Sequence, residues 1–413
     1  MRIFLLSGVC LALMFSASGA EAKEKAVSLS LDQAILQAIQ KAPEIAKTSA
    51  LSKAADGARR QSTAWTNPQL SVESENIGGS GPYKGYDSAE TTVSVSQLVE
   101  IGGKRSARRA IAERDQSLAQ LQQKAETINV VRQVKVAFAR AAVSQERLKL
   151  AKQQSNLAND ILGGVKRRVD AAADPLYQKN KARIALASSE LELKKAQREN
   201  DASIKILGQL VGGEVSKVDA NSLYDIVKPQ EGVIVEPDVV ISREDLEIER
   251  SKATLALEKA NAVPDPTITA GVRNFKEEDS NAFVVGVSFP IPVLNLNRGN
   301  IQKAGYELAA RDAERQQNIR NAKTEILDRQ RMAADAYQEA ETLKKTILPE
   351  AEAALKDARR GYDAGSFAYL DVLDAQRTLF ESKTTYLNAL LDYQINRAEV
   401  EYLTAPVSSP EKK

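Results

Sequence analysis

Asp371 and Asp374 are the acidic pair whose spacing most directly suggests a site. They lie three residues apart shortly after Gly365, in a stretch rich in helix-forming residues, and residues at i and i+3 share one face of a helix. Two carboxylates on one face attract cations and repel each other, which suits a narrow place in a cation path. Acidic residues in the first turn of a helix also interact favourably with its dipole. The residues alone leave both interpretations open.

The rest of the composition argues against an enzyme. The 413 residues include no histidine, so the commonest general base and the commonest transition-metal ligand are both missing. The single cysteine is Cys10, and we find no phosphate-binding loop, dinucleotide fingerprint or nucleophile elbow. Basic and acidic residues balance to a net charge of +2, which does not favour nucleic acid as a partner. We expect no catalytic residue, no cofactor and no metal site.

The first 22 residues have the pattern of a cleaved secretory signal. Arg2 precedes an apolar run, and Ala20 and Ala22 stand at the spacing of a signal-peptidase site. No later run approaches the roughly 20 apolar residues that a membrane-spanning helix needs. A mature chain embedded in a membrane would therefore have to cross it as strands.

The sequence contains an internal repeat. A shift of 193 residues aligns Val169-Asp170-Ala171-Ala172 with Tyr362-Asp363-Ala364-Gly365, which indicates a tandem duplication. The predicted organisation is a signal peptide (1–22), a first repeat (23–211), a linker or equatorial segment (212–241), a second repeat (242–405) and a C-terminal tail (406–413).

Each repeat contains two alternating apolar and polar segments of strand length. The four predicted strands are residues 66–76, 90–98, 266–275 and 282–290. Strands with one apolar and one polar face suit a wall between lipid and water. Four strands cannot close into a barrel, and an open edge in lipid leaves backbone groups unpaired. The pattern therefore predicts an oligomer in which each copy contributes four strands.

Long amphipathic helices fill most of the remaining chain. Each repeat opens with a helix, the first of which has a capping box at Ser30 and a break or bend at Pro43. A helical hairpin follows the strands in each repeat, over about 104–210 and 297–403, with a kink expected at Pro349. Helices of this length exceed what a globular domain requires.

The most specific segment is Gly361-Tyr362-Asp363-Ala364-Gly365-Ser366-Phe367-Ala368-Tyr369-Leu370-Asp371-Val372-Leu373-Asp374-Ala375-Gln376. It resembles the second hairpin tip of the TolC family of outer-membrane efflux proteins, and Pro290-Ile291-Pro292 is one of several supporting matches. The resemblance implies a mostly α fold with a small β part. In that fold, three protomers form an α-helical tunnel continuous with a 12-stranded β-barrel in the outer membrane.

The resemblance also implies partners and cargo. Gln97 to Arg105 is similar to the CzcC-type branch, which exports divalent heavy metals. The expected function is the passive exit duct of a tripartite RND-type efflux system. Its partners would be two further copies of the chain, a periplasmic adaptor, an inner-membrane RND pump and outer-membrane lipid. The alternatives are a channel for organic compounds and a periplasmic coiled-coil adaptor or structural protein.

By the same resemblance, the hairpin tips would carry the gate. The gate candidates are Asp371, Asp374 and Tyr362, and the candidates for adaptor contact are Asp170, Ala172, Asp174, Gly365 and Ser366. Phe367 stands where the family sometimes has an arginine, so a salt-bridge latch from that position is not expected. Asp174 precedes Pro175 and is predicted to cap the following helix.

Overall fold

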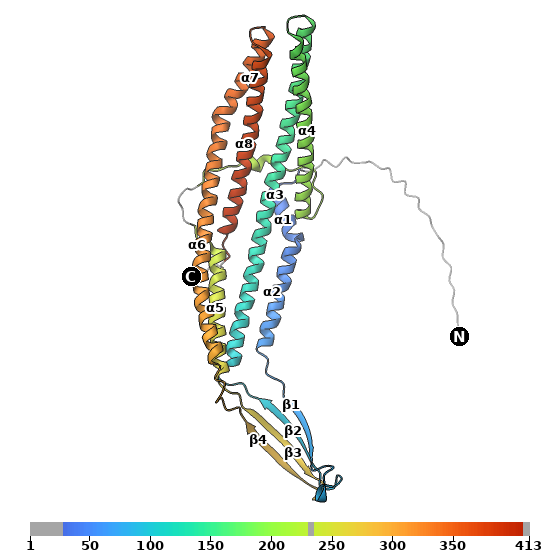
Figure 1. Cartoon of the computed structure of the whole chain (residues 1–413), viewed down its shortest axis with the longest axis vertical. Coiled ribbons are helices and arrows are strands. Elements are labelled where there is room, and N and C mark those ends of the chain that lie inside the picture. Colours follow the sequence, from blue (N-terminus) through green and yellow to red (C-terminus); the bar gives the residue numbers. More distant parts are fainter. Residues whose placement is uncertain (1–27, 230–234, 408–413) are drawn as a thin grey trace, which may run out of the picture.

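The computed structural model describes residues 28–229 and 235–407. The described chain forms a long, curved rod, helical over most of its length, with a small sheet at one end (Figure 1). This is the predicted fold class, which the structure confirms. The predicted signal segment and all but two residues of the predicted tail lie outside the described residues. None of the helices in the described part of the chain combines enough length with enough apolar character to cross a membrane.

The first half contains four helices: α1 (Leu31–Lys41), α2 (Pro43–Ser62), α3 (Lys104–Asp170) and α4 (Leu176–Val211). The capping box forms as predicted, because the Ser30 hydroxyl accepts from the Gln33 N–H and the Gln33 side chain accepts from the Ser30 N–H. The chain bends at Ala42, since Pro43 disfavours helical geometry in the residue before it. With 67 residues, α3 is about 100 Å long.

The second half repeats this order with α5 (Asp238–Asn261), α6 (Arg298–Thr342), α7 (Leu348–Asp363) and α8 (Tyr369–Leu403). A π-helical turn at Leu343–Ile347 joins α6 to α7, and there the Leu348 N–H donates to the Leu343 carbonyl. The irregularity was expected at Pro349 and lies just before it. A proline ring clashes with the carbonyl four residues earlier, and the wider turn removes that conflict.

The four strands form one antiparallel sheet in the order β1 (Gln69–Glu75), β2 (Glu90–Leu98), β3 (Thr267–Phe275) and β4 (Ser280–Ser288). β1 is shorter than predicted and begins after Pro68, while β4 lies two residues earlier than predicted and ends before Pro290. A proline has no N–H to donate to a ladder, so both prolines stand outside the paired region.

The two faces of the sheet differ in polarity. One face carries the exposed apolar side chains Leu70, Val72, Val93, Val95, Ile268, Val272, Phe283, Val285 and Val287. On the other face Arg273 bonds Glu75 at 3.1 Å and Glu90 at 3.0 Å. A Cβ added to Gly271 on this polar face would lie 2.7 Å from the Cβ of Ser94, well inside the usual spacing of paired residues. The sheet therefore curls toward its polar face.

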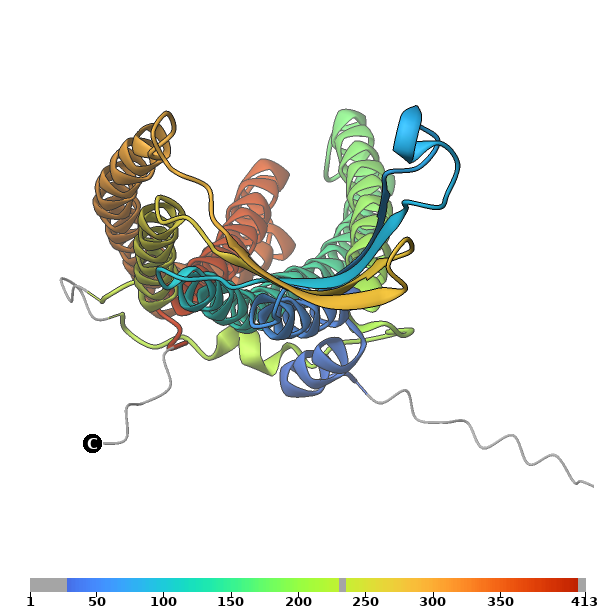
Figure 2. The same ribbon diagram turned by 90° about the horizontal axis from the view of Figure 1, so that it is seen from below.

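Each strand continues one helix of the lower half of the rod. The chain passes from α2 into β1, from β2 into α3, from α5 into β3 and from β4 into α6. The helices pack in the matching order, α2 on α3, α3 on α5 and α5 on α6. Seen along the rod, helices and sheet follow one arc with an open concave side (Figure 2). The protomer is thus a curved wall of four staves.

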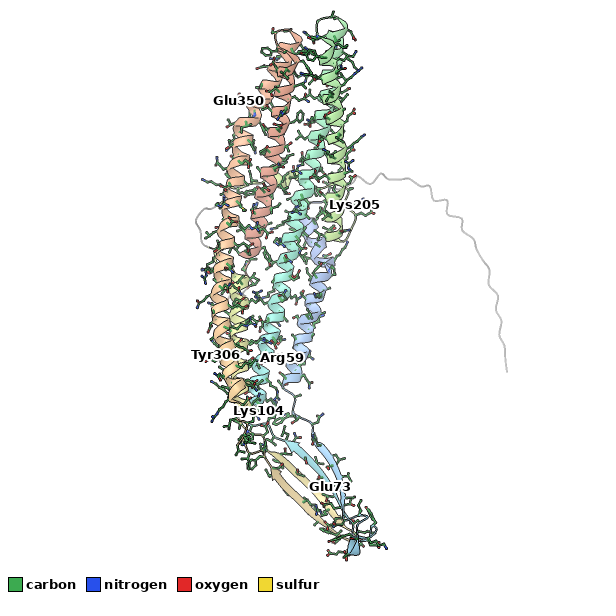
Figure 3. All side chains as sticks on the ribbon, in the orientation of Figure 1. Arg59, Glu73, Lys104, Lys205, Tyr306 and Glu350 are labelled. Atoms are coloured by element: carbon green, nitrogen blue, oxygen red, sulfur yellow. The ribbon has the colours of Figure 1, made fainter. Side chains whose placement is uncertain are left out.

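Ion pairs brace the point where helices meet sheet. Lys104, labelled there in Figure 3, places Nζ 2.6 Å from Oδ2 of Asp265, and both side chains are largely buried. Asp265 also accepts from the Ile101 N–H at 2.9 Å. Beside them the two terminal guanidinium nitrogens of Arg108 donate to the two carboxylate oxygens of Glu100, at 2.5 and 2.7 Å. Glu100, Ile101 and Lys104 of this junction lie in the Gln97–Arg105 segment singled out in the sequence, and their partners Arg108 and Asp265 lie outside it.

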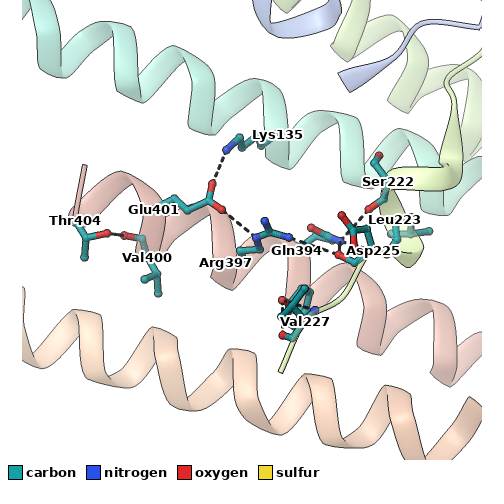
Figure 4. A network of polar contacts seen from close by, with 11 residues as sticks. Lys135, Ser222, Leu223, Asp225, Val227, Gln394, Arg397, Val400, Glu401 and Thr404 are labelled. Carbon is teal, nitrogen blue, oxygen red and sulfur yellow. Dashed lines mark hydrogen bonds and ion pairs between the residues drawn. The ribbon is translucent and has the colours of Figure 1, made fainter. Parts of the chain in front are cut away.

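Residues 212–229 of the linker between the repeats lie on the outside of the rod at mid-height (Figure 1). Its predicted end at residue 241 is too late, because α5 already begins at Asp238 behind Pro237. Its described part contains a 3₁₀ turn at Ala220–Tyr224, and one isolated bridge joins Leu29 to Val218. A polar network attaches it to α8 (Figure 4), where Gln394 donates to three carbonyls of the linker and Arg397 pairs with Glu401.

Candidate functional site at the hairpin tips

The two hairpin turns at the end of the rod opposite the sheet have equivalent geometry. Ala172 and Gly365, which are 193 residues apart, both have positive φ, at 57° and 79°. The Ala173 N–H donates to the Arg168 carbonyl, and the Ser366 N–H donates to the Gly361 carbonyl, again at equivalent positions. Positive φ closes a helix end by bringing the following N–H groups onto its last carbonyls. The duplication read from the sequence therefore extends to the hydrogen bonds of the turns.

Arg168 and Asp174 close the first turn from within. Nε of Arg168 lies 2.9 Å from Oδ2 of Asp174, and the Asp174 side chain is only 9% exposed. The hydrogen bond from Arg168 holds the pKa of Asp174 below its ordinary value of 3.8. Asp174 does not cap α4 as predicted, because the helix begins at Leu176 without a side-chain cap. A charged guanidinium makes a stronger partner for the carboxylate than a backbone N–H.

Tyr362 links the first tip to the second. Its ring is buried, and its hydroxyl donates to Oδ2 of Asp174 at 2.6 Å. The guanidinium of Arg168 lies 4.8 Å from the ring centroid and donates to the Tyr362 carbonyl at 3.1 Å. Burial, and then the hydrogen bond to Asp174, raises the pKa of Tyr362 above its ordinary range. Phenol, guanidinium and carboxylate thus form one contact between the two hairpins of a single protomer.

Tyr369 and Phe367 complete the packing of the second tip. The Tyr369 ring is 6.0 Å from that of Tyr362 at a tilted angle of 53°, and burial raises its pKa to about 12. The Phe367 ring lies so close to Gly361 that an added Cβ there would be 2.3 Å from it. Phe367 therefore covers the turn, and the arginine of this tip contact comes from the other hairpin.

Asp371 and Asp374 both lie exposed on the first turns of α8. The Asp371 carboxylate accepts from the Ala368 N–H at 2.8 Å, which is the capping interaction of an acidic residue in the first turn. Asp374 lies one turn further along. The structure brings neither carboxylate to Tyr362. The helix-capping interpretation is thus observed for Asp371. Both carboxylates are exposed on the surface of the protomer.

The candidates for adaptor contact do not form a single group. Four of them are exposed at the two turns: Asp170, Ala172, Gly365 and Ser366. Oδ1 of Asp170 lies 3.7 Å from Nζ of Lys179. Asp174 points inward and has little free surface. Sequence reasoning missed Arg168 and Tyr369, since no spacing rule relates Arg168 to a tyrosine 194 positions away.

The contacts of this site are hydrogen bonds and an ion pair between side chains of the two hairpins. Within the described residues no cluster of three or more acidic, histidine or cysteine side chains is arranged to hold a metal ion. Charge-assisted hydrogen bonds of this kind are stronger than bonds between neutral groups, and here they hold the two helical hairpins together.

The chain is similar to known proteins both in sequence and in fold. The family model described as "Outer membrane efflux protein" matches residues 34–213 and 241–405, one stretch in each repeat. The cobalt-zinc-cadmium resistance protein CzcC of Cupriavidus metallidurans is 30% identical over 81% of this chain and 80% of its own. The nickel-cobalt-cadmium resistance protein NccC of Alcaligenes xylosoxydans xylosoxydans is 26% identical over 74% of this chain and 70% of its own. The solved structure of CusC superposes with a TM-score of 0.77 at 19% identity, covering 92% of each chain.

Proposed function

Because this chain belongs to the outer membrane efflux protein family, we propose that it is the exit duct of a tripartite efflux system. It conducts substrate passively from a periplasmic adaptor and an inner-membrane RND pump to the outside. The pump supplies the energy and the substrate. This chain supplies the conduit and a gate at the hairpin tips.

The curved four-stave wall is the observation that carries this proposal. β1 and β4 are the sheet's two edges, and edge strands expose unpaired N–H and C=O groups. The apolar face of the sheet is exposed, and the sheet curls away from it. Such a wall becomes stable in lipid when copies join edge to edge into a closed cylinder, apolar outside and polar inside. Three copies would close twelve strands and twelve helical staves around one axis.

The cargo we propose is a divalent heavy-metal cation. Support comes from the relatives, whose names refer to cobalt, zinc, cadmium and nickel. The polar face of the sheet adds Glu73, Glu75 and Glu90 against one arginine, Arg273, so the inside of the cylinder would favour cations. Export of organic compounds is the alternative, and a change in drug sensitivity rather than metal sensitivity on deletion would favour it.

We assign the gating role to the contact between Tyr362 and Asp174 at the hairpin tips. In a closed ring the three Tyr362–Asp174 contacts would hold each second hairpin inward. Three copies of Asp371 and Asp374 would then face one another at the narrow end, and their mutual repulsion favours opening. An adaptor that binds the exposed turn residues Asp170, Ala172, Gly365 and Ser366 would compete with the contact and open the duct.

The test is the mass and conductance of the protein purified from outer-membrane fractions. We expect a detergent-solubilised trimer that conducts ions in a planar bilayer and prefers cations. A strain without the chain should become sensitive to cobalt, zinc or cadmium salts. A water-soluble monomer without conductance would overturn the proposal and return attention to a periplasmic coiled-coil role.

A further inference from the structure

The segment between β4 and α6 exposes an unusual number of apolar side chains. Phe289, Ile291, Val293 and Leu294 are 62%, 72%, 74% and 98% exposed. Exposed apolar residues are common when single, but a contiguous group of this kind marks a contact surface. The segment lies at the junction between helices and sheet, away from the paired part of the sheet.

The end of this segment next to α6 is held by Asn297. The Asn297 side-chain amide donates to the Glu258 carbonyl at 2.7 Å and to the Glu258 carboxylate at 2.8 Å, which attaches the segment to α5. The Asn297 N–H donates to the Asn295 side chain at 3.0 Å. Asn297 therefore anchors the α6 end of the segment to α5, while the apolar side chains before it stay exposed.

The position of the segment identifies what it faces. It joins the edge strand β4 to the edge helix α6, so it lies on one lateral edge of the wall. The opposite edge at the same junction is residues 63–68, which join α2 to β1. When copies close edge to edge, β4 of one meets β1 of the next, and α6 meets α2. Residues 289–296 of one copy are then brought to residues 63–68 of its neighbour.

The opposite edge offers a matching surface. Trp65 is 59% exposed, and the Arg105 guanidinium of α3 lies 4.4 Å from its ring centroid. Arginine above an aromatic ring stabilises it and orients it. One face of the indole is thus covered from within the protomer, and the other face is open at the edge.

Backbone pairing cannot continue through this region. Pro290 and Pro292 have no N–H, and Pro68 interrupts the opposite edge in the same way. Past the end of the strands the regular ladder between copies is therefore interrupted, and side chains are expected to make most of the contact.

We propose that residues 289–296 form an intersubunit seal that packs against Trp65 and residues 63–68 of the adjacent copy. The seal closes the wall at the level where strands give way to helices, where neither ladder hydrogen bonds nor helix packing closes it. The inference rests on the proposed ring of copies and adds the residues that join them at this level.

Disulfide cross-linking tests the seal, because Cys10 is the only native cysteine and lies in the predicted signal segment. The double variant Ala64→Cys/Leu294→Cys should form covalent trimers on oxidation, seen on a non-reducing gel. Each single variant should stay monomeric on that gel. The control pair is Leu36→Cys/Leu294→Cys, in which Leu36 is 61% exposed on α1, away from the junction, and it should not cross-link.

The mass of each variant measured in detergent distinguishes a trimer that does not cross-link from a protein that forms no trimer. An intact trimer in which the Ala64/Leu294 pair fails to cross-link overturns the seal and leaves the proposed duct standing. The absence of any trimer overturns both.

Lipid is the rival occupant, and fluorescence quenching tests for it. A bimane label at Leu294→Cys should be quenched by spin-labelled phosphatidylcholine much less than one at Val285→Cys, on the apolar sheet face. Equal quenching would assign the segment to the membrane and overturn the seal.

Discussion

The hydroxyl oxygen of Tyr362 lies 2.6 Å from Oδ2 of Asp174, across 188 residues of sequence. Tyr362 belongs to α7 and Asp174 to the turn before α4, so the bond joins the tips of both repeats. Arg168 contacts both partners at once, through its ion pair with Asp174 and its position over the Tyr362 ring.

Removal of the Tyr362 hydroxyl should favour the open duct. A hydrogen bond to a charged acceptor contributes about 1.5–3 kcal/mol, and about 1.4 kcal/mol corresponds to a factor of ten. Tyr362→Phe should therefore raise the open probability in a planar bilayer by about tenfold or more. Tyr369→Phe is the matched control, since it removes a neighbouring hydroxyl and leaves the Tyr362–Asp174 pair in place. Equal effects of the two variants would contradict the role of the bond.

Acid should release the same contact. The pKa of Asp174 is lowered in the folded protein, mainly by Arg168, so the carboxylate stabilises the closed tip fully above its ordinary value of 3.8. That stabilisation is lost as the pH falls below this value and through the lowered pKa. Conductance should rise over that acid range. In Arg168→Gln the rise should begin at a higher pH, and an unchanged profile would exclude Asp174 as the titrating group.

Substitutions of Asp371 and Asp374, the two acidic residues in the first turns of α8, should have different effects. Asp371→Ala removes an acceptor for the Ala368 N–H and should cost about 1 kcal/mol of stability, whereas Asp371→Asn keeps an acceptor. Asp374→Asn should leave the melting temperature unchanged and reduce the cation preference of the channel, measured as a smaller reversal potential in a salt gradient. No change in selectivity with either asparagine would leave capping as the only role.

The junction ion pair should matter for stability. Lys104→Met would leave the Asp265 carboxylate largely buried without its cation, a loss that costs about 3 kcal/mol. Denaturant unfolding of the detergent-solubilised protein measures it. The double variant Lys104→Met/Asp265→Asn should recover part of the loss. A double variant as unstable as the single one would mean that charge is not the cause.

Much of the architecture could be predicted because it follows from local patterns. The alternation at Phe283, Val285 and Val287 defines a strand with one apolar face, and the capping box at Ser30 defines a helix start. The limits of β1 and β4 were predicted only approximately, because the predicted ranges 66–76 and 282–290 include Pro68 and Pro290, which lie outside the paired strands.

The tip contact could not be predicted in the same way. Asp174 was expected to cap a helix, and locally it could, but Arg168 and Tyr362 compete for its carboxylate once the two hairpins lie side by side. Such a contact depends on tertiary packing between distant segments, which a single sequence does not reveal. The same holds for Trp65, whose partner Arg105 follows only after two strands of the sheet.

The π-helical turn before Pro349 shifts the register of the buried positions through which α6 and α7 pack against α8. Buried positions below it recur at steps of three and four, at Ala333, Ala336, Ala340 and Leu343, and above it again at Ala351, Leu355, Ala358 and Tyr362. The step from Leu343 to Ala351 is one residue longer than a heptad, and the π turn absorbs this extra residue. Without it every position up to Tyr362 would be rotated by about 100°. The orientation of Tyr362 is therefore set 15 to 19 residues away, by one extra residue in the π turn at Leu343–Ile347.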